Sequence, residues 1–172
     1  MKEKADPQLA PVSEPQTSSV VSVDRVTLPD LPAIIAIDLD ITGSEKPEYW
    51  YGLYAANQSD ANSPFLAAHV DAEVVGYIVG SFRAWEFGAP RCGWVHAIGV
   101  KPDSRKLGVA TKLFEELARH LMAVGATTIR TMIHIDNQVL MSFFRFQGMT
   151  AGPFIELEMS LDALSETGRD IA

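Results

Sequence analysis

The stretch VKPDSRKLGVAT, residues 100–111, decides the fold because the hydrophobic period changes within it. The residues before it, Trp94–Val100, favour a strand, and a strongly amphipathic helix begins near Gly108. Gly125 is typical of the end of that helix. Its apolar residues recur at i, i+1, i+4 and i+5, as on one face of a helix: Val109, Ala110, Leu113, Phe114, Leu117, Ala118, Leu121 and Met122.

The start of this helix has the chemistry of an anion site. First-turn backbone N–H groups have no partner within the helix, and the macrodipole is positive there. A diphosphate can accept those hydrogen bonds. Gly108 and Ala110 have almost no side chain, so an anion can approach the backbone, and Arg105 and Lys106 add positive charge just before it.

An alternative interpretation needs no ligand. Gly108 and Ala110 would then permit close packing of the helix on a sheet, and Arg105 and Lys106 would belong to a solvated loop. The motif is not a Walker loop, which needs Gly-Lys-Ser/Thr, and it lacks the three-glycine spacing of a dinucleotide fingerprint.

Further elements follow on both sides of this stretch. Helical periodicity predicts helices, and β-branched or alternating runs bounded by turn residues predict strands. The expected helices are Leu28–Ile41, Pro47–Asn57 and one from about Asn137 to Gln147. The expected strands are Phe65–Val70, Val74–Ala84, Trp94–Val100, Thr128–Ile135 and Phe154–Leu161. This order predicts an α/β fold in which helices cover both faces of a mixed sheet.

The length of 172 residues fits one domain, and 47% hydrophobic residues can build a core. Residues 1–22 are rich in Pro, Ser, Gln and Glu, which predicts a flexible tail. The predicted organisation is therefore a tail at 1–22, a domain at 23–164 and a C-terminal tail at 165–172.

The charge balance is 14 basic against 22 acidic residues, a net of −8. This sign argues against partners rich in phosphate, such as nucleic acid or an anionic membrane. It mildly favours a cationic partner such as an amine. The single cysteine, Cys92, excludes an intrachain disulfide, and the four histidines show no metal-ligand spacing. Without an apolar run of about 18 residues or a secretory signal, the expectation is a cytoplasmic protein without a metal.

Two segments of this chain resemble the signatures of the GNAT family, the Gcn5-related N-acetyltransferases. The first is Ile98-Gly99-Val100 with Pro102 and Arg105-x-x-Gly108-x-Ala110, which resembles the family's coenzyme A-binding segment. The second comprises Asn137, Phe143-Phe144 and Gly148-Met149. The order of elements from about 23 to 162 is also similar.

The resemblance implies the acyl-CoA N-acyltransferase fold, a mixed and mostly antiparallel sheet whose two central parallel strands splay apart. Acetyl-CoA would lie between Trp94–Val100 and Thr128–Ile135, and its pantetheine would bond the strand at Ile98 and Val100, on either side of Gly99. Asn137 would bond the pantetheine or a neighbouring carbonyl, or would simply cap its helix. The pyrophosphate would rest on backbone N–H groups of Arg105, Lys106, Leu107, Gly108, Val109, Ala110 and Thr111.

This sequence departs from the family pattern in both signatures. Phe144 stands where a tyrosine often protonates the leaving thiolate, and phenylalanine has no proton to donate. A thiol pKa near 8.5 makes thiolate a tolerable leaving group, so catalysis need not be lost. Lys106, where glycine is common, is a second departure.

A general base must deprotonate an amine acceptor. Alternation places Trp94, His96 and Ile98 on one face of their strand, and His96 has a suitable reference pKa of about 6.5. His96 is therefore the first candidate base, although it also fits a plain strand position. Glu156 is the alternative, with Glu158 on the same face of the last strand, and Glu86 is a further carboxylate.

The expected function is acetyl transfer from acetyl-CoA to a primary amine by direct attack in a ternary complex. The acceptor is left open among a protein N-terminus, a lysine side chain and a small amine, and homodimers are common in the family. Its pocket would draw on Asp38, Asp40, Glu45, Tyr49, Trp50 and Tyr51, although such aromatics are more often core residues and such carboxylates are usually solvated. A non-catalytic CoA-binding regulatory module and a structural domain without cofactor are the alternatives.

Overall fold

The computed structural model describes residues 20–85 and 88–162. These residues fall into two compact units that divide after Met132. Residues 1–19 of the predicted N-terminal tail, and the whole predicted C-terminal tail, lie outside the described residues. Among those described, no helix is long and apolar enough to cross a membrane.

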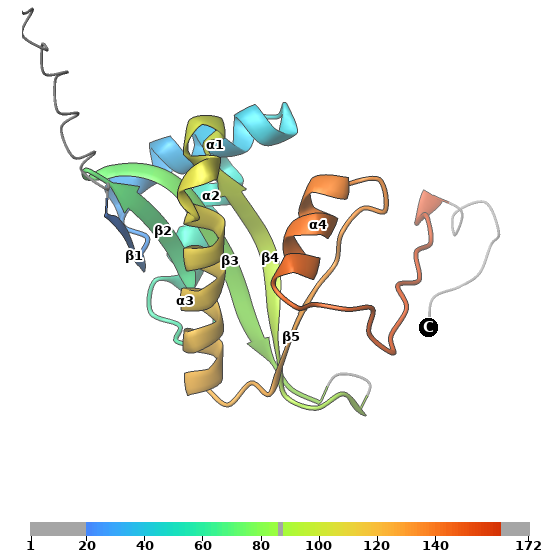
Figure 1. Cartoon of the computed structure of the whole chain (residues 1–172). Coiled ribbons are helices and arrows are strands. Elements are labelled where there is room, and N and C mark those ends of the chain that lie inside the picture. Colours follow the sequence, from blue (N-terminus) through green and yellow to red (C-terminus); the bar gives the residue numbers. More distant parts are fainter. Residues whose placement is uncertain (1–19, 86–87, 163–172) are drawn as a thin grey trace, which may run out of the picture. The chain divides into compact units, whose positions relative to one another are not determined.

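The first unit is built on a five-stranded sheet with the strand order β1-β2-β3-β4-β5 (Figure 1). Neighbouring strands are antiparallel except for β4 and β5, which are parallel. The strands are β1 (Val21–Arg25), β2 (Phe65–Val70), β3 (Glu73–Arg83), β4 (Cys92–Val100) and β5 (Thr128–Thr131). β1 corrects the predicted boundary of the tail, because Val21 and Ser22 already pair with β2.

Helices cover both faces of this sheet, as the sequence predicts. They are η1 (Leu28–Asp30), α1 (Leu31–Thr42), α2 (Pro47–Asn57), η3 (Pro102–Leu107) and α3 (Val109–Ala123). On one face, α1 and α2 bury Leu31, Ile34, Ile37 and Trp50 against Tyr77 and Val79 of β3.

On the other face, α3 lies along the sheet (Figure 1), and its leucines come close to glycines of β3 and β4. A Cβ on Gly80 of β3 would lie 2.8 Å from the Leu117 side chain, and one on Gly93 of β4 would lie 2.5 Å from Leu121. An added Cβ at either position would crowd a leucine side chain of α3, and glycine leaves room for it.

The second unit, taken by itself, contains α4 (Gln138–Phe146). The helix begins after Asn137 and stops before Gly148, which has φ +86°, and both features agree with the prediction. The predicted strand Phe154–Leu161 is wrong, because none of its residues pairs in a ladder. Alternation makes a segment suitable for a strand, but a strand also needs a partner. The side chains of this segment are exposed instead, with Ile155 and Leu157 more than 80% accessible.

β5 is also shorter than predicted, ending at Thr131 instead of Ile135. Its ladder with β4 covers four residue pairs, from Cys92↔Thr128 to Val95↔Thr131. Met132 and Ile135, which the β-rich pattern places in the strand, are exposed.

Candidate functional site

The parallel strands β4 and β5 separate within the first unit. β5 ends at Thr131, opposite Val95, whereas β4 runs on to Val100. From His96 onward no described strand pairs with β4 on that side. A strand edge of this kind presents unpaired backbone donors and acceptors, to which an extended ligand can add as a strand would.

Two residues of β4 direct their backbone toward this open edge. Lys101 donates its N–H to the Val75 carbonyl on β3, at 2.8 Å. Successive residues of a strand direct their backbone groups to opposite sides, so those of Val100 and Ile98 point away from β3. Arg105 lies beside the same edge, with Nε 3.5 Å from the Val100 carbonyl oxygen.

A β-bulge at His96 corrects one expectation about β4. Val79 of β3 faces Ala97, and the next residue, Gly80, faces Val95, so His96 is the extra residue. An inserted residue reverses the alternation of side chains beyond it. Ala97 packs toward α1 and α2, so Ile98 points to the opposite, α3 face and does not share a face with Trp94.

The start of α3 is open, as an anion site requires. Its N-cap, Gly108, has φ +71°, provides no side-chain cap, and would have nothing within 4 Å of an added Cβ. The first intrahelical bond runs from the Lys112 N–H to the Gly108 carbonyl. The amides of Val109 and Ala110, which precede this bond, therefore have no acceptor within α3. Arg105 and Lys106 are both exposed at the end of η3. These features fit a diphosphate.

The start of α4 differs, because its cap is the side chain of Asn137. Asn137 Oδ1 accepts a hydrogen bond from the Leu140 N–H at 3.1 Å. The capping role given to Asn137 is therefore confirmed, and the cofactor role stays a prediction. Within the same helix Phe144 is buried, and its ring lies edge-on to that of Phe143, with centroids 5.0 Å apart.

His96 has a partner that the sequence analysis missed. Its Nε2 lies 2.7 Å from Ser81 Oγ, and Ser81 is directly opposite Trp94 in the β3–β4 hairpin. Desolvation of the imidazole, followed by the positive charge of Arg83, lowers the pKa of His96 below its ordinary value of 6.5. His96 is therefore neutral near pH 7, as a base must be. The register of β3 against β4 is the signal that identifies Ser81.

Trp94 lies beside this pair, because it faces Ser81 in the register of β3 and β4. The Arg83 guanidinium is 5.3 Å from the Trp94 ring centroid, a cation–π distance. The indole Nε1–H of Trp94 is buried and has no hydrogen-bond acceptor among the described residues.

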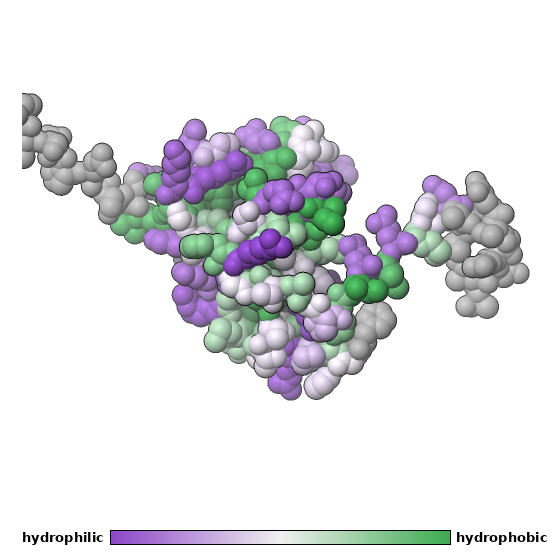
Figure 2. Space-filling view, turned by 45° about the vertical axis from the view of Figure 1, so that its right-hand side comes forward, coloured by the Kyte–Doolittle hydropathy of each residue, from purple (hydrophilic) through white to green (hydrophobic). Residues whose placement is uncertain are grey.

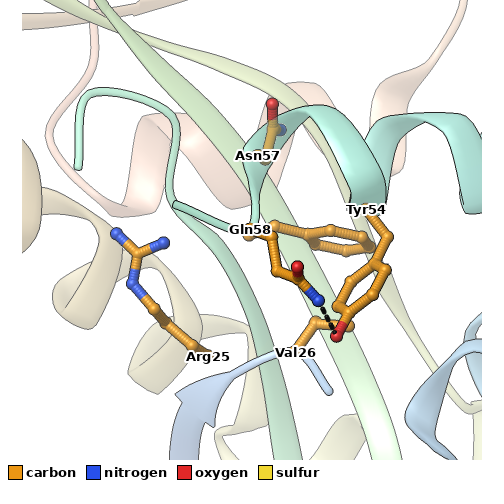
Figure 3. Close-up of a pocket in the computed structure, with 6 residues that line it drawn as sticks. Arg25, Val26, Tyr54, Asn57 and Gln58 are labelled. Carbon is orange, nitrogen blue, oxygen red and sulfur yellow. Dashed lines mark hydrogen bonds between the residues drawn. The ribbon is translucent and has the colours of Figure 1, made fainter. Parts of the chain in front are cut away.

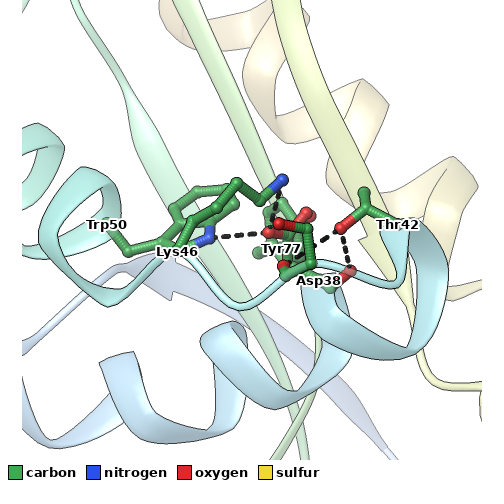
Figure 4. Close-up of polar contacts among 6 residues, drawn as sticks. Asp38, Thr42, Lys46, Trp50 and Tyr77 are labelled. Carbon is green, nitrogen blue, oxygen red and sulfur yellow. Dashed lines mark hydrogen bonds and ion pairs between the residues drawn. The ribbon is translucent and has the colours of Figure 1, made fainter.

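Two of the candidate acceptor-pocket residues belong to the core instead. Asp38 Oδ2 accepts hydrogen bonds from Trp50 Nε1 at 3.0 Å and lies 2.9 Å from Lys46 Nζ (Figure 4). Tyr77 donates to Asp38 Oδ1 at 3.4 Å, and desolvation together with the Asp38 charge raises the pKa of Tyr77 strongly. Asp38 is only 4% exposed, so its partners compensate the burial of its charge.

The remaining candidates on this side, Asp40, Glu45, Tyr49 and Tyr51, are exposed. A small surface pocket lies where β1 meets the end of α2 (Figure 3), and Gln58 donates to the Tyr54 hydroxyl there at 2.6 Å. None of its lining residues belongs to β4, η3 or α3, so it is separate from the open edge.

The structure describes two of the three alternative bases, Glu156 and Glu158. Glu156 and Glu158 are exposed and lie in no strand, so the shared strand face that recommended them is absent. Glu86 lies outside the described residues.

On the face drawn in Figure 2, hydrophilic and hydrophobic residues are intermixed. Within residues 20–85 and 88–162, no group of three or more His, Cys, Asp or Glu side chains could hold a metal ion.

Comparison with known proteins gives a family match, curated relatives and similar solved structures. A family model described as "Acetyltransferase (GNAT) family" matches residues 31–149. An acetyltransferase of Sodalis glossinidius (strain morsitans) is 35% identical over 80 residues, which are 46% of this chain and 52% of that protein. One of Pectobacterium atrosepticum is 31% identical over the same shares of the two chains. The chain thus spans about half the length of the curated relatives it matches.

Solved structures resemble this one over most of its length. An aminoglycoside N-acetyltransferase, AAC(6')-Iy, in complex with CoA has a TM-score of 0.75 at 14% identity, covering 86% of this chain and 99% of that one. A ribosomal-protein-alanine N-acetyltransferase from Brucella melitensis biovar Abortus has a TM-score of 0.66 at 19% identity, covering 83% and 99%. Likeness at this level of identity shows the fold, and it confirms the predicted fold class.

Proposed function

Because the chain belongs to the acetyltransferase (GNAT) family, we propose that it transfers an acetyl group from acetyl-CoA to a primary amine by direct attack in a ternary complex. The observation that carries the proposal is the pairing of an open β4 edge with an open helix start. β4 is followed along the chain by η3 and then by the start of α3.

In this proposal the first unit holds most of the CoA. The pantetheine adds to the β4 edge through the backbone of Ile98 and Val100. The diphosphate accepts hydrogen bonds from first-turn amides that follow Gly108, and the charges of Arg105 and Lys106 strengthen binding. Gly108 keeps the approach to these amides clear.

The chemical step needs a neutral amine, although a free lysine amine has a pKa near 10.4. His96, being neutral near pH 7, takes up the proton. A backbone N–H of the splayed strand, near Ile98, stabilises charge on the thioester oxygen of the tetrahedral intermediate. CoA leaves as the thiolate, which solvent then protonates, because Phe144 cannot.

The amine class rests on the family and on two structural relatives. Their names specify an aminoglycoside and a ribosomal-protein alanine as acceptors, and both present an amine. We extend only this shared chemistry to the present chain and leave the acceptor open among small amines, lysine side chains and protein N-termini.

Release of free thiol from acetyl-CoA tests the function directly. The purified chain is assayed with an aminoglycoside, a polyamine, a lysine peptide and a peptide with a free N-terminal alanine. We expect amine-dependent thiol release with at least one of them. Thermal unfolding is measured in parallel, because CoA at about 100 times its Kd should stabilise the fold by roughly 2.7 kcal/mol.

A second candidate function, a non-catalytic CoA-binding regulatory module, is favoured by Phe144. It predicts stabilisation by CoA without thiol release from any acceptor. If CoA does not stabilise the fold and no acceptor causes thiol release, both functions are refuted and only the fold remains.

A further inference from the structure

A polar cluster on the α1/α2 face of the sheet lies where β4 leaves β5. Ser81 is half-buried on β3 and pairs across the strands with Trp94, while His96 is the bulged residue and is exposed. The distance of 2.7 Å between Ser81 Oγ and His96 Nε2 is that of a good hydrogen bond. Because His96 is an extra residue in β4, its side chain reaches Ser81, although Ser81 is paired with Trp94.

We propose that Ser81 is a proton-relay residue, which carries the proton of the acceptor amine to His96 through its hydroxyl group. The inference rests on the proposed acetyl transfer and deepens it. It assigns a role to a residue that no motif marks.

This hydrogen bond favours proton transfer through Ser81 over direct abstraction of the proton by His96. When Ser81 donates to Nε2, that nitrogen is already occupied, and the imidazole carries its own hydrogen on Nδ1. The Ser81 oxygen still has lone pairs that can accept a hydrogen bond. We place the acceptor amine on the α1/α2 face of the sheet beside this pair, where the Ser81 oxygen is the basic end.

The step balances without another reagent. The N–H bond of the ammonium breaks and a new O–H bond forms at Ser81, while the original Oγ–H bond breaks and an Nε2–H bond forms at His96. The products are a neutral amine and an imidazolium. The amine lone pair is then free to attack the thioester carbonyl, and the imidazolium loses its proton to solvent.

Burial and the charge of Arg83 favour a neutral imidazole before the step. Arg83 and Tyr77 of β3 share its face, and the register places Arg130 of β5 beside Trp94. The Asp38–Lys46 ion pair connects α1 to the start of α2 on the same face. Of these charges, Arg83 is the one that lowers the pKa of His96, after desolvation. The imidazole therefore titrates below pH 6.5.

The test compares Ser81→Ala, Ser81→Thr, His96→Ala and the double variant with the wild type, using the acceptor found by thiol release. Ser22→Ala is the matched control, because Ser22 is an exposed strand serine on β1. We expect Ser81→Ala to lower kcat about tenfold or more at pH 7 with little change in KM. The double variant should be no slower than His96→Ala, because the two groups act as one path.

The pH profile separates a relay from a structural role. The wild-type rate should fall below pH 6.5 as His96 becomes protonated. In Ser81→Ala this limb should vanish, and the rate should approach that of the wild type as the pH nears the pKa of the amine. Ser81→Thr keeps the hydroxyl and should restore most of kcat and the limb.

Each outcome decides between the two proposals. If the wild type turns over and Ser81→Ala matches it in kcat and pH profile, the relay is overturned and acetyl transfer stands. If Ser81→Ala is slow at every pH by the same factor, the residue is structural and the relay is again overturned. A wild type that consumes no acetyl-CoA with any acceptor removes both proposals.

Discussion

Two helices of this protein start in opposite ways. α3 begins at Gly108, which supplies no side chain, whereas α4 begins at Asn137, which supplies its own hydrogen-bond acceptor. The first turn of α4 is partly satisfied from within, so it needs no ligand to account for its sequence. The first turn of α3 begins without a side-chain cap beside two exposed cations, and we propose an anion as its partner.

Placing a carboxylate at the start of α3 should produce the largest change. In Gly108→Glu a negative charge and bulk occupy the space where the diphosphate would bind, and CoA affinity should fall more than a hundredfold. Isothermal titration with CoA measures it. Gly43→Glu is the matched control, because Gly43 has φ +70° and equally open space at the end of α1. Both variants carry the same backbone strain, so similar CoA affinity in the two would contradict the anion site.

Removing one cation beside α3 should have the next largest effect. Arg105→Gln should weaken CoA binding about tenfold at low salt, because charge-assisted hydrogen bonds to phosphate are strong. The loss should shrink at 0.5 M salt, where exposed charges are screened. Arg119→Gln, an exposed arginine near the other end of α3, should leave the affinity unchanged. A loss independent of salt would argue that Arg105 acts on folding instead.

The sequence predicts most of the difference between these helix starts. A helical period from Val109 onward, ended by Gly125, locates α3, and the absence of a capping side chain at Gly108 is evident. Asn137 is itself a signal for a helix cap. Local chemistry decides such features, so local sequence predicts them.

Features that depend on pairing between strands were not predicted. The bulge at His96 arises because Val79 and Gly80 of β3 face residues two apart on β4, which no single strand reveals. The Ser81–His96 hydrogen bond depends on the same register. Likewise, alternation in residues 154–161 shows a segment suited to a sheet but does not say which edge, if any, it pairs with.

Removing the cap of α4 should have a smaller and local effect. Asn137→Ala deletes the acceptor of the Leu140 N–H, which should destabilise the helix by about 1 kcal/mol. Native-state hydrogen exchange should show about fivefold faster exchange in the first turns of α4. Amides of α3 should keep their wild-type protection. Unchanged exchange at Leu140 would mean that the cap contributes no stability.

Changing the cap to a carboxylate should give the smallest effect, with the opposite sign. Asn137→Asp keeps an oxygen acceptor for the Leu140 N–H and adds negative charge at the positive end of α4, so this helix should gain about 0.3–1 kcal/mol. The interaction lowers the pKa of the new carboxyl in the folded state, so the gain is present above its unfolded value near 3.9 and is lost as the pH falls through the folded value.

The same substitution removes the amide Nδ2 donor, which separates the two roles given to Asn137. If the side chain only caps α4, CoA affinity should stay at the wild-type level in Asn137→Asp and the slower exchange should be the only change. If CoA accepts a hydrogen bond from Nδ2, affinity should fall although the helix is more stable. The contrast between the two helix starts would then be incomplete, because the self-capped helix would also serve the cofactor.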